Sequence, residues 1–174
     1  MKKTTSPFKL LWNFAYSVQS KILFVLLLAV TFLEFIQVIL RYVLHAPLFG
    51  IEELLLFPTI WLYLLGGANA SWEKSHITCG VLSLYIKRPR SVAIFNTVKG
   101  IVSITVCGWL AYWAFAYFQY SFKVWKLSAT LYIPLVLGES ALFIGLFLMT
   151  VYTAVELKDD LKELFSTFGH SVSD

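Results

Sequence analysis

Two carboxylates lie inside long runs of apolar residues, where an unpaired charge costs several kcal/mol. Glu34 lies in the first run and Glu139 in the last. Gln37 and Arg41 follow Glu34 at spacings of three and seven residues, which places the three side chains on one face of a helix. Glu34, Gln37, Arg41 and Glu139 are therefore the candidates for chemistry within a membrane or for a polar contact between helices.

The two carboxylates are expected at similar depths. Glu34 lies about 10 Å along a helix from Arg41, and Glu139 lies about 12 Å from the outer end of an expected span at 131–154. One interpretation is an ion or proton site between the first and fourth spans. The other is a buried polar face at a helix or subunit interface, with Arg41 extending toward water. The second is favoured, because no interrupted span with free backbone carbonyls accompanies the carboxylates.

A second charged group marks the outer ends of the first two apolar runs. Glu52 and Glu53 open the second run, where negative charge interacts favourably with the helix dipole. Arg41 is one short loop away. We therefore expect an outer ion pair of Arg41 with Glu52 and Glu53, and the alternative is a contact with a protein outside the membrane.

The residue types that hold cofactors are missing from the apolar runs. A membrane cytochrome needs histidines that face each other within the spans, whereas His45, His76 and His170 all lie outside them. The sequence has no cluster of metal-ligating residues, no glycine-rich phosphate loop and no serine in a nucleophile elbow. We therefore expect no enzyme activity, no cofactor and no metal. Cys79 and Cys107 are expected to be inert thiols.

Four apolar runs must position these residues. Of the 174 residues, 59% are hydrophobic and 14% are charged, whereas soluble domains average about 45–50% and about 25%. Each run matches the roughly 20 residues with which a helix crosses a bilayer. The sequence predicts one all-α membrane domain over 1–174, with four transmembrane helices at 22–40, 51–70, 97–119 and 131–154. A soluble enzyme domain, a nucleic-acid-binding module and a disordered chain are excluded.

The basic residues are distributed unevenly between the segments outside the spans. Eleven of the fourteen lysines and arginines lie in 1–21, 71–99 and the tail 156–174. The other three, Arg41, Lys123 and Lys126, lie at the opposite ends of the spans. Because cytoplasmic segments carry the excess of Lys and Arg, both termini are expected in the cytoplasm.

Two segments are expected to lie on the membrane surface. Residues 1–21 combine four lysines with apolar residues at helical spacing, which predicts an amphipathic interfacial helix. Residues 81–86 are apolar but too short to cross a bilayer. Beside them, Lys87, Arg88 and Arg90 suit the anionic headgroups of membrane phospholipids.

The segment 41–77 carries a pattern similar to that of a known family. In chain order the pattern consists of Arg41-Tyr42, an outer turn, Glu52-Glu53, Ile60-Trp61-Leu62, Gly66, Ala68, Ala70 and His76-Ile77. It resembles the small membrane subunit of tripartite ATP-independent periplasmic (TRAP) transporters, the DctQ-like family. The four-span layout extends the resemblance along nearly the whole chain. One departure is Thr78-Cys79-Gly80, where an Asp is expected after the His-Ile pair.

The resemblance implies a multi-pass protein of the bacterial inner membrane. It implies a scaffold subunit of a sodium-coupled importer of organic acids, of the C4-dicarboxylate or sialic acid class. The implied partners are a large permease subunit, which carries the substrate and sodium sites and moves as an elevator, and a periplasmic substrate-binding protein.

Two other functions are compatible with four spans. A self-sufficient exporter would use Glu34 to exchange protons for a cationic drug, but the chain is long for that class and contains Glu139 as well. A membrane anchor for a redox complex is disfavoured, because the histidines lie outside the spans.

Overall fold

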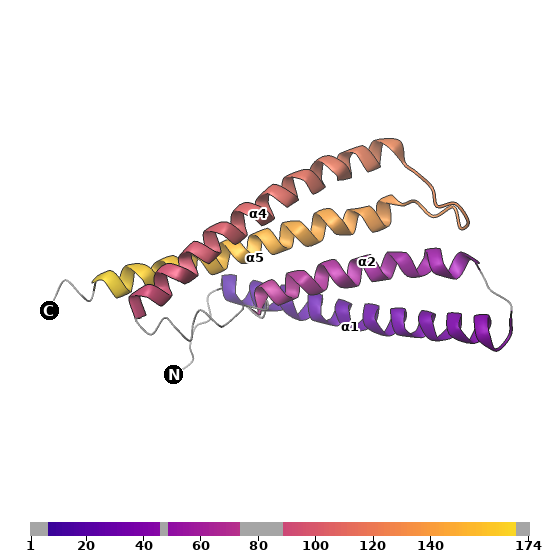
Figure 1. Ribbon diagram of the computed structural model, residues 1–174, viewed down its shortest axis with the longest axis horizontal. Helices are drawn as coiled ribbons and strands as arrows, with labels where there is room; N and C mark the ends of the chain where they lie inside the picture. The colour runs from indigo at the N-terminus through magenta and orange to yellow at the C-terminus, as the bar shows by residue number, and fades with distance from the viewer. Residues whose placement is uncertain (1–6, 46–48, 74–88, 170–174) are drawn as a thin grey trace.

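The computed structural model describes residues 7–45, 49–73 and 89–169, which form four long helices (Figure 1). These are α1 (Pro7–Tyr42), α2 (Phe49–Trp72), α4 (Pro89–Val124) and α5 (Val136–Gly169). Each contains a segment that is long and apolar enough to cross a membrane: Phe14–Tyr42, Gly50–Trp72, Ser91–Val124 and Val136–Lys162. The predicted all-α architecture with four membrane-spanning helices is thereby confirmed.

The helices extend beyond the predicted spans. Helix α1 continues without a break from Pro7, so the part of the expected interfacial segment that the structure describes runs directly into the first span. Helix α5 begins at Val136 rather than at 131, because the preceding residues form a small hairpin. It then runs to Gly169 through most of the predicted tail. Whether residues 1–21 lie on the membrane surface stays a prediction.

Part of the predicted phospholipid-binding segment lies outside the described residues. This applies to 81–86, Lys87 and Arg88, and also to His76 of the family pattern. Arg90 lies in the first turn of α4, but its side chain is outside the description. The headgroup interaction therefore stays a prediction.

The four helices pack side by side in the order α1, α2, α5, α4. Helix α5 contacts both α4 and α2, and α2 contacts α1. Within the described residues, α1 and α4 share no comparable contact, so the row is not closed into a bundle. Figure 1 shows that the helices converge where α1 begins and α5 ends, and spread apart toward the opposite end. We name these the inner end and the outer end.

Helices α2 and α5 approach each other closely at Gly145. A Cβ atom added at Gly145 would lie 2.7 Å from the Cβ of Leu64 and 3.2 Å from its carbonyl carbon and oxygen. Ala141, one turn before Gly145, is completely buried. Small side chains therefore let the two backbones approach closely, as is common between helices in membranes.

Large apolar side chains cover the outward faces of the row. On α4, Trp109 and Tyr112 are 67% and 69% exposed, and on α1, Phe32 and Phe35 are similarly exposed. An exposed apolar surface of this extent fits lipid or a partner protein rather than water.

Candidate functional site

Polar side chains connect the helices at two levels of the row. Near the outer end, Glu53 holds the hairpin between α4 and α5; we call this contact the outer clasp. Near the inner end, polar and aromatic side chains join α1, α2 and α5; we call this contact the inner clasp. The clasps position the helices and are described in turn.

The hairpin of the outer clasp follows α4. Trp125 adopts a left-handed backbone conformation with φ of 48°, immediately after the last residue of the helix. The Ser128 N–H then donates to the Ile133 carbonyl at 2.9 Å, and the Leu135 N–H donates to the Lys126 carbonyl at 2.9 Å. These bonds make residues 126–135 a compact turn that leads into α5.

Glu53, in the first turns of α2, binds the tip of this hairpin. The Ser128 hydroxyl donates to Glu53 Oε2. The backbone N–H of Thr130 donates to Oε1 at 3.0 Å, and that of Leu131 donates to Oε2 at 2.9 Å. Charge-assisted hydrogen bonds of this kind are stronger than neutral ones. The carboxylate therefore ties α2 to the segment that joins α4 and α5.

Within the described residues, no ion pair joins Arg41 to Glu52 or Glu53. Glu52 Oε1 accepts a hydrogen bond from Gln37 Nε2 at 3.1 Å, and Glu53 is bound by the hairpin. Arg41 is exposed, its guanidinium carbon lies 5.9 Å from the centre of the Tyr42 ring, and within the described residues it has no acidic partner. Both carboxylates instead accept hydrogen bonds from uncharged donors: Glu52 from the Gln37 side chain, and Glu53 from the hairpin.

The described residues do not bring Glu34 of the first span and Glu139 of the fourth span into contact. Tyr117 on α4 donates its hydroxyl to Glu139 Oε1 at 2.8 Å, so Glu139 is engaged toward α4. Glu34 is exposed on α1 and makes no hydrogen bond or ion pair in the part of the chain that is described. In the described residues Glu139 is therefore bound toward α4, and Glu34 shares no partner with it.

The expected depth of Glu139 also needs correction. Helix α5 begins at Val136, so Glu139 lies in its first turn rather than about eight residues into the span. The hairpin at 126–135 takes up the residues that were assigned to the outer part of the span.

Gln19 is the centre of the inner clasp. It lies on α1 and is only 7% exposed. Its amide nitrogen donates to the Leu65 carbonyl of α2 at 3.1 Å, and its amide oxygen accepts from the Tyr152 hydroxyl of α5 at 2.7 Å. A single side chain thus connects three helices.

Aromatic rings extend the inner clasp. The Trp72 ring stacks on Tyr16 at a centroid distance of 5.2 Å and meets Tyr152 edge-on at 5.3 Å. The Tyr16 hydroxyl donates to Glu73 Oε1, which also accepts from Asn69 Nδ2 at 3.3 Å. Stacked and edge-on aromatic pairs add to the burial of their surfaces, so the inner ends of α1, α2 and α5 are held together.

Sequence reasoning did not identify the inner clasp. Gln19 falls in the segment 1–21, whose polar residues were expected to face water or headgroups. One feature of the sequence could have indicated this contact. Gln19 lies between apolar residues on a helix that continues into a span, and a polar side chain in such a position forms hydrogen bonds with a neighbouring helix. The partner was beyond prediction, because the Leu65 carbonyl is a backbone atom 46 residues away.

Residues of the family pattern mainly support contacts between helices. Trp61 on α2 donates its indole N–H to the Leu137 carbonyl of α5 at 2.9 Å. Gly66 faces Leu23 of α1, whose Cδ2 would lie 4.0 Å from an added Cβ. Tyr42 is exposed beside Arg41. The pattern therefore marks α2 as the helix against which both neighbours pack.

The described polar side chains position the helices relative to one another. In the described ranges, no three His, Cys, Asp or Glu side chains lie close enough to hold a metal ion. Apart from exposed Glu34, the carboxylates discussed above accept hydrogen bonds from neighbouring helices or from the hairpin. The site is thus a set of structural contacts beside open apolar faces.

Comparison with known proteins yields one family. A family model described as "Tripartite ATP-independent periplasmic transporters, DctQ component" matches residues 19–163. A search of curated proteins finds no match. The matched range contains Glu53, the hairpin, Gln19 and Tyr152.

Proposed function

The chain belongs to the DctQ component family of TRAP transporters, and we propose that it is the scaffold subunit that holds the large permease of such a transporter in the membrane. As a small transporter component with four membrane-spanning helices, it is a multi-pass protein of the inner membrane and not an enzyme. The scaffold role, the substrate and the partners are the parts of this proposal that need experiments.

The observation that carries the scaffold role is the open row of helices. A transport pathway needs polar groups around a cavity that spans the membrane. Here Glu52, Glu53 and Glu139, together with Gln19, bind neighbouring elements, and the row is not closed around a lumen. In this proposal the permease carries the substrate and sodium sites and moves as an elevator, while this chain provides a fixed surface.

We place the permease against the face of α1 that contains Glu34. A carboxylate facing lipid is costly, and Glu34 is exposed among apolar side chains that include Phe35 and Val38. A partner helix that supplies a hydrogen-bond donor or a cation would remove that cost. Gln37 and Arg41 lie along the same face of the helix.

The substrate class and the orientation follow from the family and from the charge distribution. An organic acid, such as a C4-dicarboxylate or a sialic acid, would be delivered by a periplasmic substrate-binding protein. The excess of Lys and Arg in the sequence segments 1–21, 71–99 and 156–174 supports cytoplasmic termini.

The scaffold role is tested with proteoliposomes that contain the chain alone, the permease alone or both. We expect a sodium gradient to drive uptake of an organic acid only when the permease is present. Uptake by this chain alone would contradict the proposal.

The position of the permease is tested by crosslinking from single cysteines in a Cys107→Ala, Cys79→Ala background. Cysteines at Phe35 and Val38 of α1 should react with the permease more efficiently than cysteines at Trp109 and Tyr112 of α4. The opposite preference would place the permease on the α4 side of the row.

Glu34→Gln separates a scaffold from a proton-coupled exporter. In a scaffold the substitution weakens capture of the permease, whereas in an exporter it abolishes proton coupling by the chain alone. Glu139→Gln is the control, because Glu139 is engaged by Tyr117 within the chain.

A further inference from the structure

Three aromatic side chains that carry hydrogen-bond donors are exposed together on α4. Trp109, Tyr112 and Trp113 are each more than half exposed, and none of them makes a hydrogen bond in the described part of the chain. The rings of Tyr112 and Trp113 meet edge-on with their centres 6.3 Å apart. Two indole N–H groups and one phenol hydroxyl therefore project from about one turn of the helix, and no acceptor among the described residues binds them.

These donors lie at a depth where lipid offers no acceptor. Tyr112 follows Lys99 by thirteen residues and precedes Lys123 by eleven, distances of about 20 and 17 Å along a helix. The two lysines bracket a length close to the hydrocarbon thickness once their side chains extend toward the headgroups, so Tyr112 lies near the centre of the bilayer. Tyr and Trp are normally enriched at the membrane surfaces. A donor exposed to hydrocarbon is costly, and a protein surface with acceptors would remove that cost.

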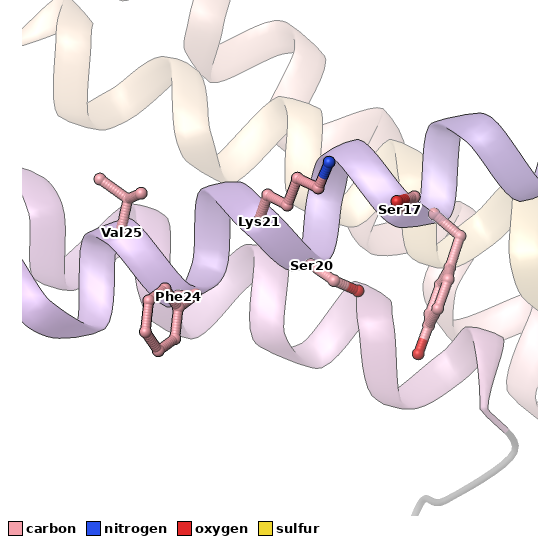
Figure 2. A pocket seen from close by; sticks show the side chains of 6 residues that line it. Ser17, Ser20, Lys21, Phe24 and Val25 are labelled. Atoms are coloured by element: carbon pink, nitrogen blue, oxygen red, sulfur yellow. The ribbon is translucent and has the colours of Figure 1, made fainter.

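Exposure alone does not distinguish α4, because α1 exposes large side chains as well. Figure 2 shows Phe24 and Val25 on α1, about one turn beyond Lys21. Lipid tails cover such hydrocarbon side chains, which have no polar group to satisfy. The group of exposed donors, and not the amount of apolar surface, therefore sets the face of α4 apart.

Small residues flank the donors on the same face of α4. Gly108 and Ala116 lie four residues before and after Tyr112, one turn to either side of it. Nothing lies within 4 Å of a Cβ added at Gly108, and Ala116 is exposed. Glycine is less favourable than alanine within a helix, and the contacts of the described residues do not explain its presence here. Small and polar side chains together are typical of surfaces where membrane helices pack against each other.

We propose that this face of α4 binds α4 of a second copy of the chain, in the same orientation in the membrane. A twofold axis along the membrane normal brings each residue near its own counterpart. A phenol hydroxyl both donates and accepts, so one Tyr112 hydroxyl donates to the other, and the Tyr112 oxygens can also accept from the Trp109 indole one turn away. Gly108 and Ala116 let the two backbones approach closely enough for these bonds.

The two edges of the row favour different partners. A tyrosine hydroxyl can pair with a copy of itself, whereas the ionised carboxylate of Glu34 on α1 only accepts and needs a different side chain opposite it. Within the described residues, α1 and α4 are the end helices of the row. A second copy at α4 therefore leaves the α1 face open, and the dimer does not depend on the position of the permease.

The dimer is tested by sedimentation equilibrium of the full chain, without permease, in density-matched detergent micelles. We expect a monomer–dimer equilibrium that Tyr112→Phe weakens about three- to twentyfold, the range for one hydrogen bond between membrane helices. Gly108→Leu should abolish the dimer, because it places a large side chain between the helices. The open space around Gly108 lets this variant fold, which circular dichroism checks. Tyr63→Phe is the matched control, since Tyr63 is an exposed tyrosine on α2, ten residues from Glu53 and from Glu73.

The face of α4 is tested in liposomes by oxidation of single cysteines in a Cys79→Ala, Cys107→Ala background. Ala116→Cys should form disulfide-linked dimers more efficiently than Leu110→Cys, because Leu110 is also exposed on α4 but lies about 160° around the helix from Tyr112. Equal yields would mean random collisions and would overturn the face. A chain that stays monomeric, or equal weakening by Tyr63→Phe and Tyr112→Phe, would overturn the dimer. A monomer whose Ala116→Cys reacts with the permease would assign the face to the permease instead.

Discussion

Glu53 shows how a carboxylate at the outer end of the row is held without a cation. Its oxygens accept from the Ser128 hydroxyl and from the N–H groups of Thr130 and Leu131. Glu53→Gln removes the charge that strengthens these bonds and places an amide N–H against the donors, so we expect the thermal midpoint in detergent to fall by several degrees. Glu52→Gln is the control, because Glu52 accepts one bond from the Gln37 side chain. Equal midpoints for the two variants would show that the hairpin does not depend on Glu53.

The inner clasp permits a measurement of one interaction between α1 and α5. We compare Gln19→Leu, Tyr152→Phe and the double variant by their free energies of unfolding in detergent. The hydrogen bond between Gln19 and Tyr152 should give a coupling of about 0.6 kcal/mol, and at most about 1.7 kcal/mol, as found for such bonds in membrane proteins. Additive effects of the two substitutions would mean that the clasp is held by the rings of Tyr16 and Trp72 instead.

Individual partners were only partly predictable from the sequence. The position of Glu52 and Glu53 at the start of the second span follows from the boundary of the apolar run and agrees with the structure. Their partners do not follow, because an ion-pair argument considers side chains of opposite charge. The donors to Glu53 include backbone N–H groups more than seventy residues away, which no spacing of residue types reveals.

Among the helices, the contact between α2 and α5 depends on Gly145. An added Cβ would meet both the side chain and the backbone carbonyl of Leu64, so relief requires the helices to separate. We expect Gly145→Ala to destabilise the protein by about 1–3 kcal/mol. Gly108→Ala on α4 is the control: nothing lies within 4 Å of its added Cβ, so helix propensity should leave stability unchanged or raise it by up to about 1 kcal/mol. Equal effects at the two glycines would contradict the close packing.

The four spans were predictable because the thickness of the bilayer sets the length of an apolar helix that crosses it. This length depends little on which other helices the span contacts. Their ends were less predictable. Residues 131–135 are apolar and read as part of a span, yet the Leu135 N–H bonds the Lys126 carbonyl and Leu131 binds Glu53. The outer end of α5 is therefore determined by contacts with a hairpin and with α2, and composition does not report such contacts.

For the whole molecule, the order α1, α2, α5, α4 has a measurable consequence at the outer end. Val38 on α1 and Gln119 on α4 are exposed and lie four and five residues before the ends of their helices. Packed helices are about 8–10 Å apart and the row spreads toward the outer end (Figure 1), so three steps along an open row separate these helices by at least roughly 24 Å. In a closed bundle, α1 and α4 would be neighbours at roughly 10 Å. The open row also leaves apolar faces exposed, because in a closed bundle the contact between α1 and α4 would bury part of them.

Spin labels at Val38 and Gln119, measured by pulsed dipolar spectroscopy in lipid nanodiscs, distinguish these arrangements. We expect a distribution centred near the longer separation, and a short distance for a control pair at Gln119 and Leu137 on the contacting helices α4 and α5. The measurement is made on the chain alone, with one copy in each nanodisc, because Val38 lies on the face that we place against the permease and Gln119 lies on the helix that we place against a second copy. A distance of roughly 10 Å would mean that the four helices close into a bundle, and the two clasps would then not suffice to hold the row open.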